Sequence, residues 1–271
     1  MFIRIVSLLL AVYSTSLAAE KYIVGAQNIQ YLPHYDFSSP VDKGVGWAIL
    51  EAFSKHSGHE FIYLSMPIRR LQMELMKGHV DFVYPDNPNW YNQITKAEDK
   101  FFSLPLTHAI TGTLVKQKNS GKGINSIKRI VMPLGFTPVN WQTRVDEKLT
   151  EIIWTSDIYA GLSMLQKGRV DAMDLEVHVG KYYSEHTLGF DNFVLDLTLP
   201  HNEAPFMLST LHHQAILAEL NQFIKSNPQK IREIKQAYGI INYGDLKPTL
   251  IKQQDVDEID IWHTPAAAAL R

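Results

Sequence analysis

Near the start of the chain, segments with the apolar spacing of a strand alternate with segments that have the apolar spacing of a helix. Lys21–Gln27 is a short, mostly apolar run that predicts a buried strand. Within Gly46–His56 the large apolar side chains recur every three or four residues, which predicts an amphipathic helix. A second strand is predicted at Phe61–Leu64, and Pro67 stands where the next helix begins, because proline suits the first turn of a helix. This alternation is typical of an α/β fold.

An eight-residue pattern occurs twice in the chain. Leu75–Phe82 reads LMKGHVDF, and Leu165–Ala172 reads LQKGRVDA. Each copy follows a stretch with helical periodicity, and its glycine suits the left-handed position that ends a helix. The next strand starts after it, and we expect Asp81 and Asp171 to bond backbone amides rather than a ligand. The repeat therefore predicts two α/β units of similar size.

The C-terminal region contains one more predicted helix and a tail. Asn227 and Pro228 are expected to supply the N-cap and the first residue of the helix, and Gly239 to end it. Beyond it, residues 242–271 lose apolar periodicity. We expect this segment to be a poorly ordered C-terminal tail.

Residues 1–18 have the layout of a secretory signal peptide. Arg4 precedes the apolar run Ile5–Tyr13, and small residues follow, so cleavage is expected after Ala18 or, nearly as well, after Ala19. A membrane anchor is the alternative, but the run is too short to cross about 30 Å of hydrocarbon. With no cysteine in the chain, a lipid-modified N-terminus and disulfides are excluded. We expect a soluble periplasmic protein that is not a lipoprotein.

Charge and histidine spacing remove further classes of function. The 271 residues carry 26 Lys and Arg against 28 Asp and Glu, so the chain lacks the basic excess that nucleic-acid binding requires. The 11 histidines show no metal-binding spacing. No metal, cofactor or nucleic-acid partner is predicted.

Taken together, these features resemble the bacterial extracellular solute-binding proteins of family 3. These are the periplasmic substrate-binding components of ABC transporters for polar amino acids. Two short motifs add to the resemblance: Phe102–Pro105 (FSLP) looks like the family's Phe-Ser-x-Pro-Tyr, and Gly135–Thr137 (GFT) looks like its Gly-Thr turn. The resemblance covers roughly residues 21–241.

The resemblance implies an α/β, two-lobed, periplasmic-binding-protein-like fold of type II. Lobe 1 would comprise residues 19–109 and 206–241, and lobe 2 residues 110–205, with strands crossing near Ile110–Gly112 and Pro200–Pro205. The ligand would lie in the cleft between the lobes, which a hinge would close around it. The implied partners are a small-molecule solute and an inner-membrane ABC permease or a sensor, with the protein as a monomer.

The sequence departs from this family at the expected amino-acid clamp. Family members carry an arginine upstream of the Phe-Ser motif that grips the ligand α-carboxylate, but Lys96 stands near that place, and Leu106 replaces the tyrosine. By the same resemblance, the acid of lobe 2 that binds an α-amino group aligns with Glu176. The expected ligand is therefore a small polar solute, amino-acid-like or cationic.

Candidate ligand-binding residues follow the predicted strands, because ligands in α/β folds lie beyond the carboxyl ends of strands. Two such loops are rich in aromatic and amide side chains, and Arg69 lies at a helix start, where anions bind favourably. The alternatives are a surface loop whose rings pack on the body, and a surface ion pair for Arg69 or Arg70. The nine candidates are Tyr31, Tyr35, Arg69, Asp86, Asn87, Trp90, Phe136, Thr137 and Glu176.

Two classes of function remain. The favoured one is a periplasmic solute-binding protein without catalytic residues. The alternative is an enzyme on the same scaffold, similar to a dehydratase, in which Glu176 or Asp86 acts as a general acid. The sequence offers no Gly-x-Ser-x-Gly motif and no cysteine nucleophile to support catalysis.

Overall fold

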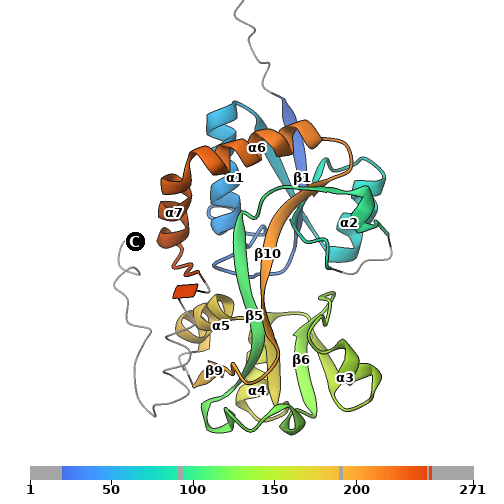
Figure 1. Ribbon diagram of the computed structural model, residues 1–271, viewed down its shortest axis with the longest axis vertical. Helices are drawn as coiled ribbons and strands as arrows, with labels where there is room; N and C mark the ends of the chain where they lie inside the picture. Colours follow the sequence, from blue (N-terminus) through green and yellow to red (C-terminus); the bar gives the residue numbers. More distant parts are fainter. Residues whose placement is uncertain (1–19, 91–93, 189–191, 243, 246–271) are drawn as a thin grey trace, which may run out of the picture.

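A computed structural model describes residues 20–90, 94–188, 192–242 and 244–245 (Figure 1). The predicted signal peptide at residues 1–18 lies outside the described residues, as does nearly all of the predicted tail at 242–271. None of the helices in the described part of the chain is both long and apolar enough to cross a membrane.

The elements alternate between strand and helix as the apolar pattern predicts. The N-terminal part contains β1 (Lys21–Gln27), α1 (Val45–Ser57), β2 (Glu60–Met66), α2 (Ile68–Met76), β3 (Phe82–Asp86) and β4 (Phe101–Phe102). The middle part contains β5 (Thr107–Lys116), β6 (Arg129–Pro133), α3 (Gln142–Asp146), β7 (Glu151–Thr155), α4 (Ile158–Gln166), β8 (Ala172–Glu176), α5 (Val177–Tyr183) and β9 (Phe193–Leu195). The chain then continues through β10 (His201–Thr210), α6 (Gln214–Ser226) and α7 (Pro228–Ala237).

The strands form two parallel units joined by an antiparallel pair. The order is β2-β1-β3-β10-β5-β8-β6-β7, with β1 parallel to β2 and β3, and β6 parallel to β7 and β8. The long strands β5 and β10 run side by side between the two halves of the molecule (Figure 1) and pair antiparallel from His201 opposite Gly112 to Phe206 opposite Thr107. We call the half with β1, β2 and β3 the first half, and the half with β6, β7 and β8 the second half.

The crossing strands contain both of the lobe divisions expected from the sequence. The division at 109/110 falls inside β5, and the division at 205/206 falls inside β10. Because both strands contribute to both halves, the structure does not fix a boundary to the residue, and the lobe limits stay predictions.

The repeated turn has the conformation that its sequence predicts. Gly78 and Gly168 have φ angles of +70° and +69°, the left-handed values that glycine tolerates without strain. The Asp81 carboxylate accepts a hydrogen bond from the Ile23 N–H at 2.7 Å, and the Asp171 carboxylate accepts two from backbone amides at the start of β6. The prediction that both aspartates bond backbone amides is confirmed.

The C-terminal helix differs from its prediction at one end. The Asn227 side chain does not cap α7; instead its amide donates to the Phe223 carbonyl at 2.8 Å and so closes the preceding helix α6. Pro228 does start α7, and Gly239, with φ of +67°, follows its end as predicted.

Candidate functional site

A cavity lies between the two halves, where β1, β3, β6 and β8 reach their carboxyl ends. It has an empty volume of about 920 Å³, counting the space that opens to solvent. Its walls come from both halves and from the crossing strands: Gln27, Tyr31, Tyr35, Ile68, Leu71, Gln72, Val83, Pro85, Asp86, Trp90, Thr111, Met132, Gly135, Phe136, Thr137, Val139, Asn140, Asp174, Leu175, Asn202, Ala204 and Phe206. This is the place at which α/β folds bind small molecules.

Six of the nine residues predicted from the sequence lie on the wall of this cavity. They are Tyr31, Tyr35, Asp86, Trp90, Phe136 and Thr137. The other three, Arg69, Asn87 and Glu176, do not lie on the wall. The residues of the two strand-end loops thus border the cavity, Asn87 apart, whereas the charged candidates Arg69 and Glu176 do not; their binding of a ligand stays a prediction.

Aromatic rings form much of the wall and connect the two halves. The rings of Tyr31 and Tyr35 are stacked with centroids 5.2 Å apart, and Tyr31 also lies 5.5 Å from Phe136 of the second half. Trp90 meets Phe206 edge to face at 5.6 Å. Burial raises the pKa of the Tyr31 and Tyr35 phenols well above the usual value, so both remain neutral.

The turn after β6 brings the second half close to α2. Gly135 has φ of +92°, a value that other residues rarely adopt, and a Cβ at this position would lie 3.2 Å from the Ile68 Cδ1. Glycine therefore allows both the turn and the close approach. The same turn places Phe136 and Thr137 on the cavity wall.

Asp86 is a buried carboxylate that already has its partners. The Lys100 ammonium lies 2.7 Å from its Oδ2, with both side chains almost fully buried. The Ser209 hydroxyl donates to the same oxygen at 2.6 Å, and the Asn87 N–H donates to Oδ1 at 2.8 Å. The charge of Asp86 is thus neutralised inside the protein.

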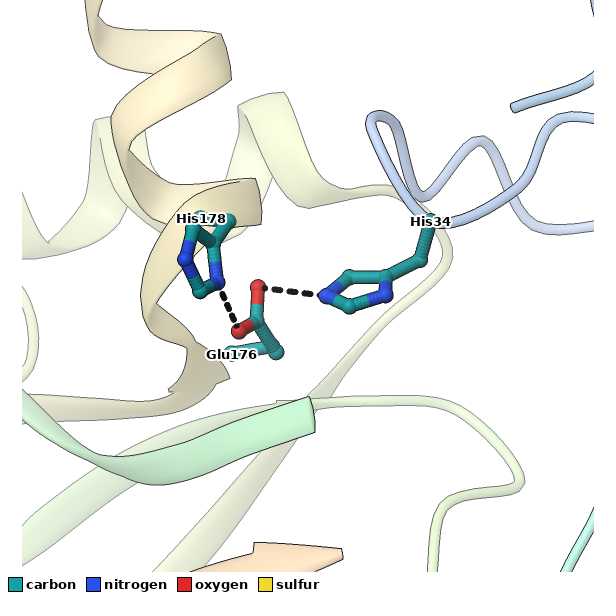
Figure 2. Close-up of side chains that lie close together, drawn as sticks. All are labelled: His34, Glu176 and His178. Atoms are coloured by element: carbon teal, nitrogen blue, oxygen red, sulfur yellow. Dashed lines mark hydrogen bonds and ion pairs between the residues drawn. The ribbon is translucent and has the colours of Figure 1, made fainter. Parts of the chain in front are cut away.

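Glu176 is the centre of a buried cluster rather than part of the cavity wall. Its oxygens accept hydrogen bonds from His178 Nδ1 (2.7 Å) and from the backbone N–H groups of Ile110 (3.1 Å) and Val179 (2.8 Å), and His34 Nε2 lies 3.2 Å from Oε2. Figure 2 shows the carboxylate between the two imidazoles. We call His34, Glu176 and His178 the clasp, because His34 belongs to the first half and the other two to the second.

The hydrogen bonds of the clasp leave little room for a metal ion. Its three side chains lie close enough to share one. However, His178 Nε2 accepts a hydrogen bond from the Ile241 N–H at 3.1 Å, so its Nδ1 carries the proton that it donates to Glu176. A metal would need that nitrogen unprotonated and the carboxylate released from its donors.

Burial alone would raise the pKa of Glu176, but the interactions with His178 and His34 outweigh burial and hold the pKa well below its usual range. Glu176 is therefore ionised and fully partnered. The expectation that it binds a ligand does not agree with its position, because its oxygens face the two imidazoles and two backbone N–H groups, and Glu176 does not line the cavity.

The remaining candidates have structural surroundings. Arg69 is exposed on α2, and its neighbour Arg70 lies 3.7 Å from Glu74, the surface ion pair expected for one of the two. Asn87 is buried and donates to the Pro205 carbonyl at 2.8 Å, which ties the loop after β3 to a crossing strand. Lys96, which stands near the family's arginine in sequence, is exposed.

Asp174 is the charged wall residue that the sequence analysis missed. It lies on β8, only 8% of its surface is exposed, and among the described residues no hydrogen bond or ion pair satisfies its carboxylate. Burial raises its pKa from the usual 3.8 to about 7. An acidic residue inside the apolar strand sequence AMDLE was the available signal, because an unpaired acid is rarely buried without a role.

Neither a protein-family model nor a curated protein matches the sequence. Solved structures do match. A substrate-binding protein of an amino acid ABC transporter is 18% identical with a TM-score of 0.62, covering 80% of this chain and 98% of that chain. An arginine transport system periplasmic binding protein from Legionella pneumophila is 14% identical with a TM-score of 0.61, covering 81% and 100%.

A third match is the ancestral amino acid-binding protein AncCDT-1, a precursor of cyclohexadienyl dehydratase. It is 18% identical with a TM-score of 0.61, covering 80% of this chain and 95% of that chain. The predicted α/β, two-lobed, periplasmic-binding-protein-like fold is confirmed by these matches. At such low identities the likeness shows the fold and carries over no ligand.

Proposed function

We propose that the protein is a periplasmic solute-binding protein that captures a small organic solute between its two halves for an ABC importer or a sensor. The observation that carries the proposal is the cavity itself, which is lined by strand-end loops of both halves and by the two crossing strands. The matched structures include binding proteins of transport systems, which agrees with such a role.

A ligand in this cavity would stabilise the closed arrangement of the halves. Tyr31 and Trp90 come from the first half, and Phe136 and Asp174 from the second, so a bound molecule touches both at once. A ligand shifts a conformational equilibrium only when it binds one state better, and only the closed state offers both sets of contacts. A permease or sensor could then recognise the closed form.

Bound solute should therefore compact the protein. We expect the radius of gyration, measured by small-angle X-ray scattering, to be smaller with saturating solute than after its removal. The solute is the one that co-purifies with the protein and is identified by mass spectrometry after denaturation. An identical radius in the two states, with binding verified by calorimetry, would contradict closure around the ligand.

Export is the second part of the proposal and has its own test. Mass spectrometry of the exported protein should give a new N-terminus at Ala19 or Glu20, because small residues precede both positions. An exported form that retains Met1 would show that residues 1–18 are not removed. The same fraction would then be tested for membrane attachment.

An enzyme on the same scaffold is the second candidate function. Asp174 favours it, because an acid in a cavity with a pKa of about 7 can donate a proton near neutral pH. Glu176 and Asp86, the acids proposed from sequence, are held by their own partners. Incubating the co-purified solute with the protein separates the two functions: a receptor releases it unchanged, and an enzyme converts it.

A further inference from the structure

Asp174 is an unpaired acid in a wall that is otherwise electrically balanced. The only other acidic side chain lining the cavity in the described part of the chain is Asp86, which Lys100 neutralises at 2.7 Å. No lysine, arginine or histidine among the described residues lines the wall. The empty cavity thus holds one uncompensated negative charge whenever Asp174 is ionised.

This charge balance discriminates between ligands. A carboxylate entering the cavity would leave water without meeting a cationic partner, which is costly for a buried ion. An ammonium group would instead pair with Asp174. An amino acid brings both groups, and only its ammonium would be compensated.

The rest of the wall suits the body of such a cation. Tyr31, Trp90, Phe136 and Phe206 offer aromatic rings, whose faces attract ammonium groups and whose area favours an apolar body. Several aliphatic side chains complete the surface: Ile68, Leu71, Met132 and Val139.

The position of Asp174 explains why Glu176 is not required for this task. The two residues are separated by one position on β8 and therefore lie on the same side of the strand. Glu176, at the strand end, is engaged by the four nitrogens around it, whereas Asp174 borders the cavity.

We propose that Asp174 anchors the ligand and that the ligand is an organic cation without a carboxylate, an amine or quaternary ammonium on an apolar body. This inference rests on the proposed function and narrows it to a substrate class. The Tyr31 phenol, whose pKa Asp174 helps to raise, is neutral, and Glu176, two positions along β8, is ionised and fully partnered.

Matched pairs of probes test the charge preference by isothermal titration calorimetry at pH 8. Each pair differs chiefly by a carboxyl group: 2-phenylethylamine and phenylalanine, tyramine and tyrosine, and choline and glycine betaine. We expect the member without the carboxylate to bind at least about tenfold more tightly, since both members pair with Asp174 through the same cationic group and only the carboxylated one buries an anion without a partner.

Variants and pH then test Asp174 itself with the best probe. Asp174→Asn should weaken binding by about 10- to 100-fold, Asp174→Glu should retain the preference for the cation, and Asp99→Asn, an exposed control, should bind as the wild type does. Because a pKa of about 7 leaves Asp174 mostly protonated at pH 6, wild-type affinity should be about tenfold weaker there than at pH 8. Asp174→Asn should show no such dependence.

The outcomes separate this inference from the proposed function. Tighter binding of the carboxylated probes, or equal binding by wild type and Asp174→Asn, would overturn the inference and leave solute binding intact. If none of the six probes binds, the solute released from the purified protein decides. A cationic solute supports the inference, an anionic or zwitterionic one overturns it, and the absence of any solute overturns the proposed function as well.

Discussion

Replacing Glu176 with glutamine should lower the free energy of unfolding by about 1–3 kcal/mol, the usual cost of leaving a buried hydrogen-bond donor unpaired. Each carboxylate oxygen of Glu176 faces one backbone N–H, that of Ile110 or that of Val179, which cannot turn away. Whichever way the new amide is oriented, its NH₂ meets a fixed donor. Urea titration at pH 7 measures the loss.

Glu185→Gln is the matched control for this substitution. Glu185 is partly exposed in the segment after α5, and its carboxylate lies 3.7 Å from the Lys181 ammonium. An exposed pair of this kind contributes about 0.5 kcal/mol at most. If Glu176→Gln is as stable as this control but no longer binds the solute, the clasp is not structural and Glu176 is the ligand-binding acid that the sequence indicated.

The same variant has a defined pH dependence. The pKa of Glu176 is lowered in the folded protein, so its stabilising contribution is complete above the unfolded value of about 4.3 and is lost as the pH falls below it. The stability difference between wild type and Glu176→Gln should therefore be constant from pH 8 to about pH 5 and shrink below about pH 4. A difference that changes between pH 6 and pH 8 would point to another group.

The sequence predicted the helices and strands better than it predicted which charged side chains of the site are free of partners within the protein. β1 was predicted at the bounds that it has, and the two glycines of the repeat adopt the left-handed conformation expected. Both features depend on local chemistry. The strand follows from an apolar run between polar neighbours, and the turn follows from a residue that tolerates positive φ. Tyr31, Trp90 and Phe136 lie on the cavity wall because a strand end determines where its loop lies, and their contact with a ligand stays a prediction.

The charged residues depend on partners that are distant in the chain. Glu176 was chosen because it aligns with a family acid, but its partner His34 is 142 positions away and nothing local indicates their contact. Asp86 likewise appears as a free carboxylate until the fold brings Lys100 and Ser209 to it. Asp174 was not predicted, because the feature that marks it is the absence of a charged partner among the described residues, and only the folded structure shows this absence.

Asp174→Asn should raise the free energy of unfolding of the empty protein at pH 8 by up to about 4 kcal/mol. The pKa of Asp174 is about 7 in the folded protein against a usual 3.8, and each unit corresponds to about 1.4 kcal/mol. Between these pH values the folded state holds a proton that the unfolded state has released, so wild-type stability falls as the pH rises from about 4 through 7. Asparagine has the shape of the protonated acid and no charge to bury.

The increase in the free energy of unfolding caused by Asp174→Asn should thus be close to zero at pH 4 and reach its full size at pH 8. Urea titration of the ligand-free protein measures it, and the control Asp99→Asn should have the stability of the wild type at both pH values. An equal effect at the two pH values would show that the charge of Asp174 is not what destabilises the fold. Asp174→Asn is thus expected to stabilise the empty protein and to weaken ligand binding. That combination is typical of a binding residue that destabilises the fold in the absence of its ligand. A cation that pairs with Asp174 removes the same unfavourable charge that asparagine removes, so the stability of wild-type protein should rise with the free concentration c of such a ligand as RT ln(1 + c/Kd), and that of Asp174→Asn should rise less.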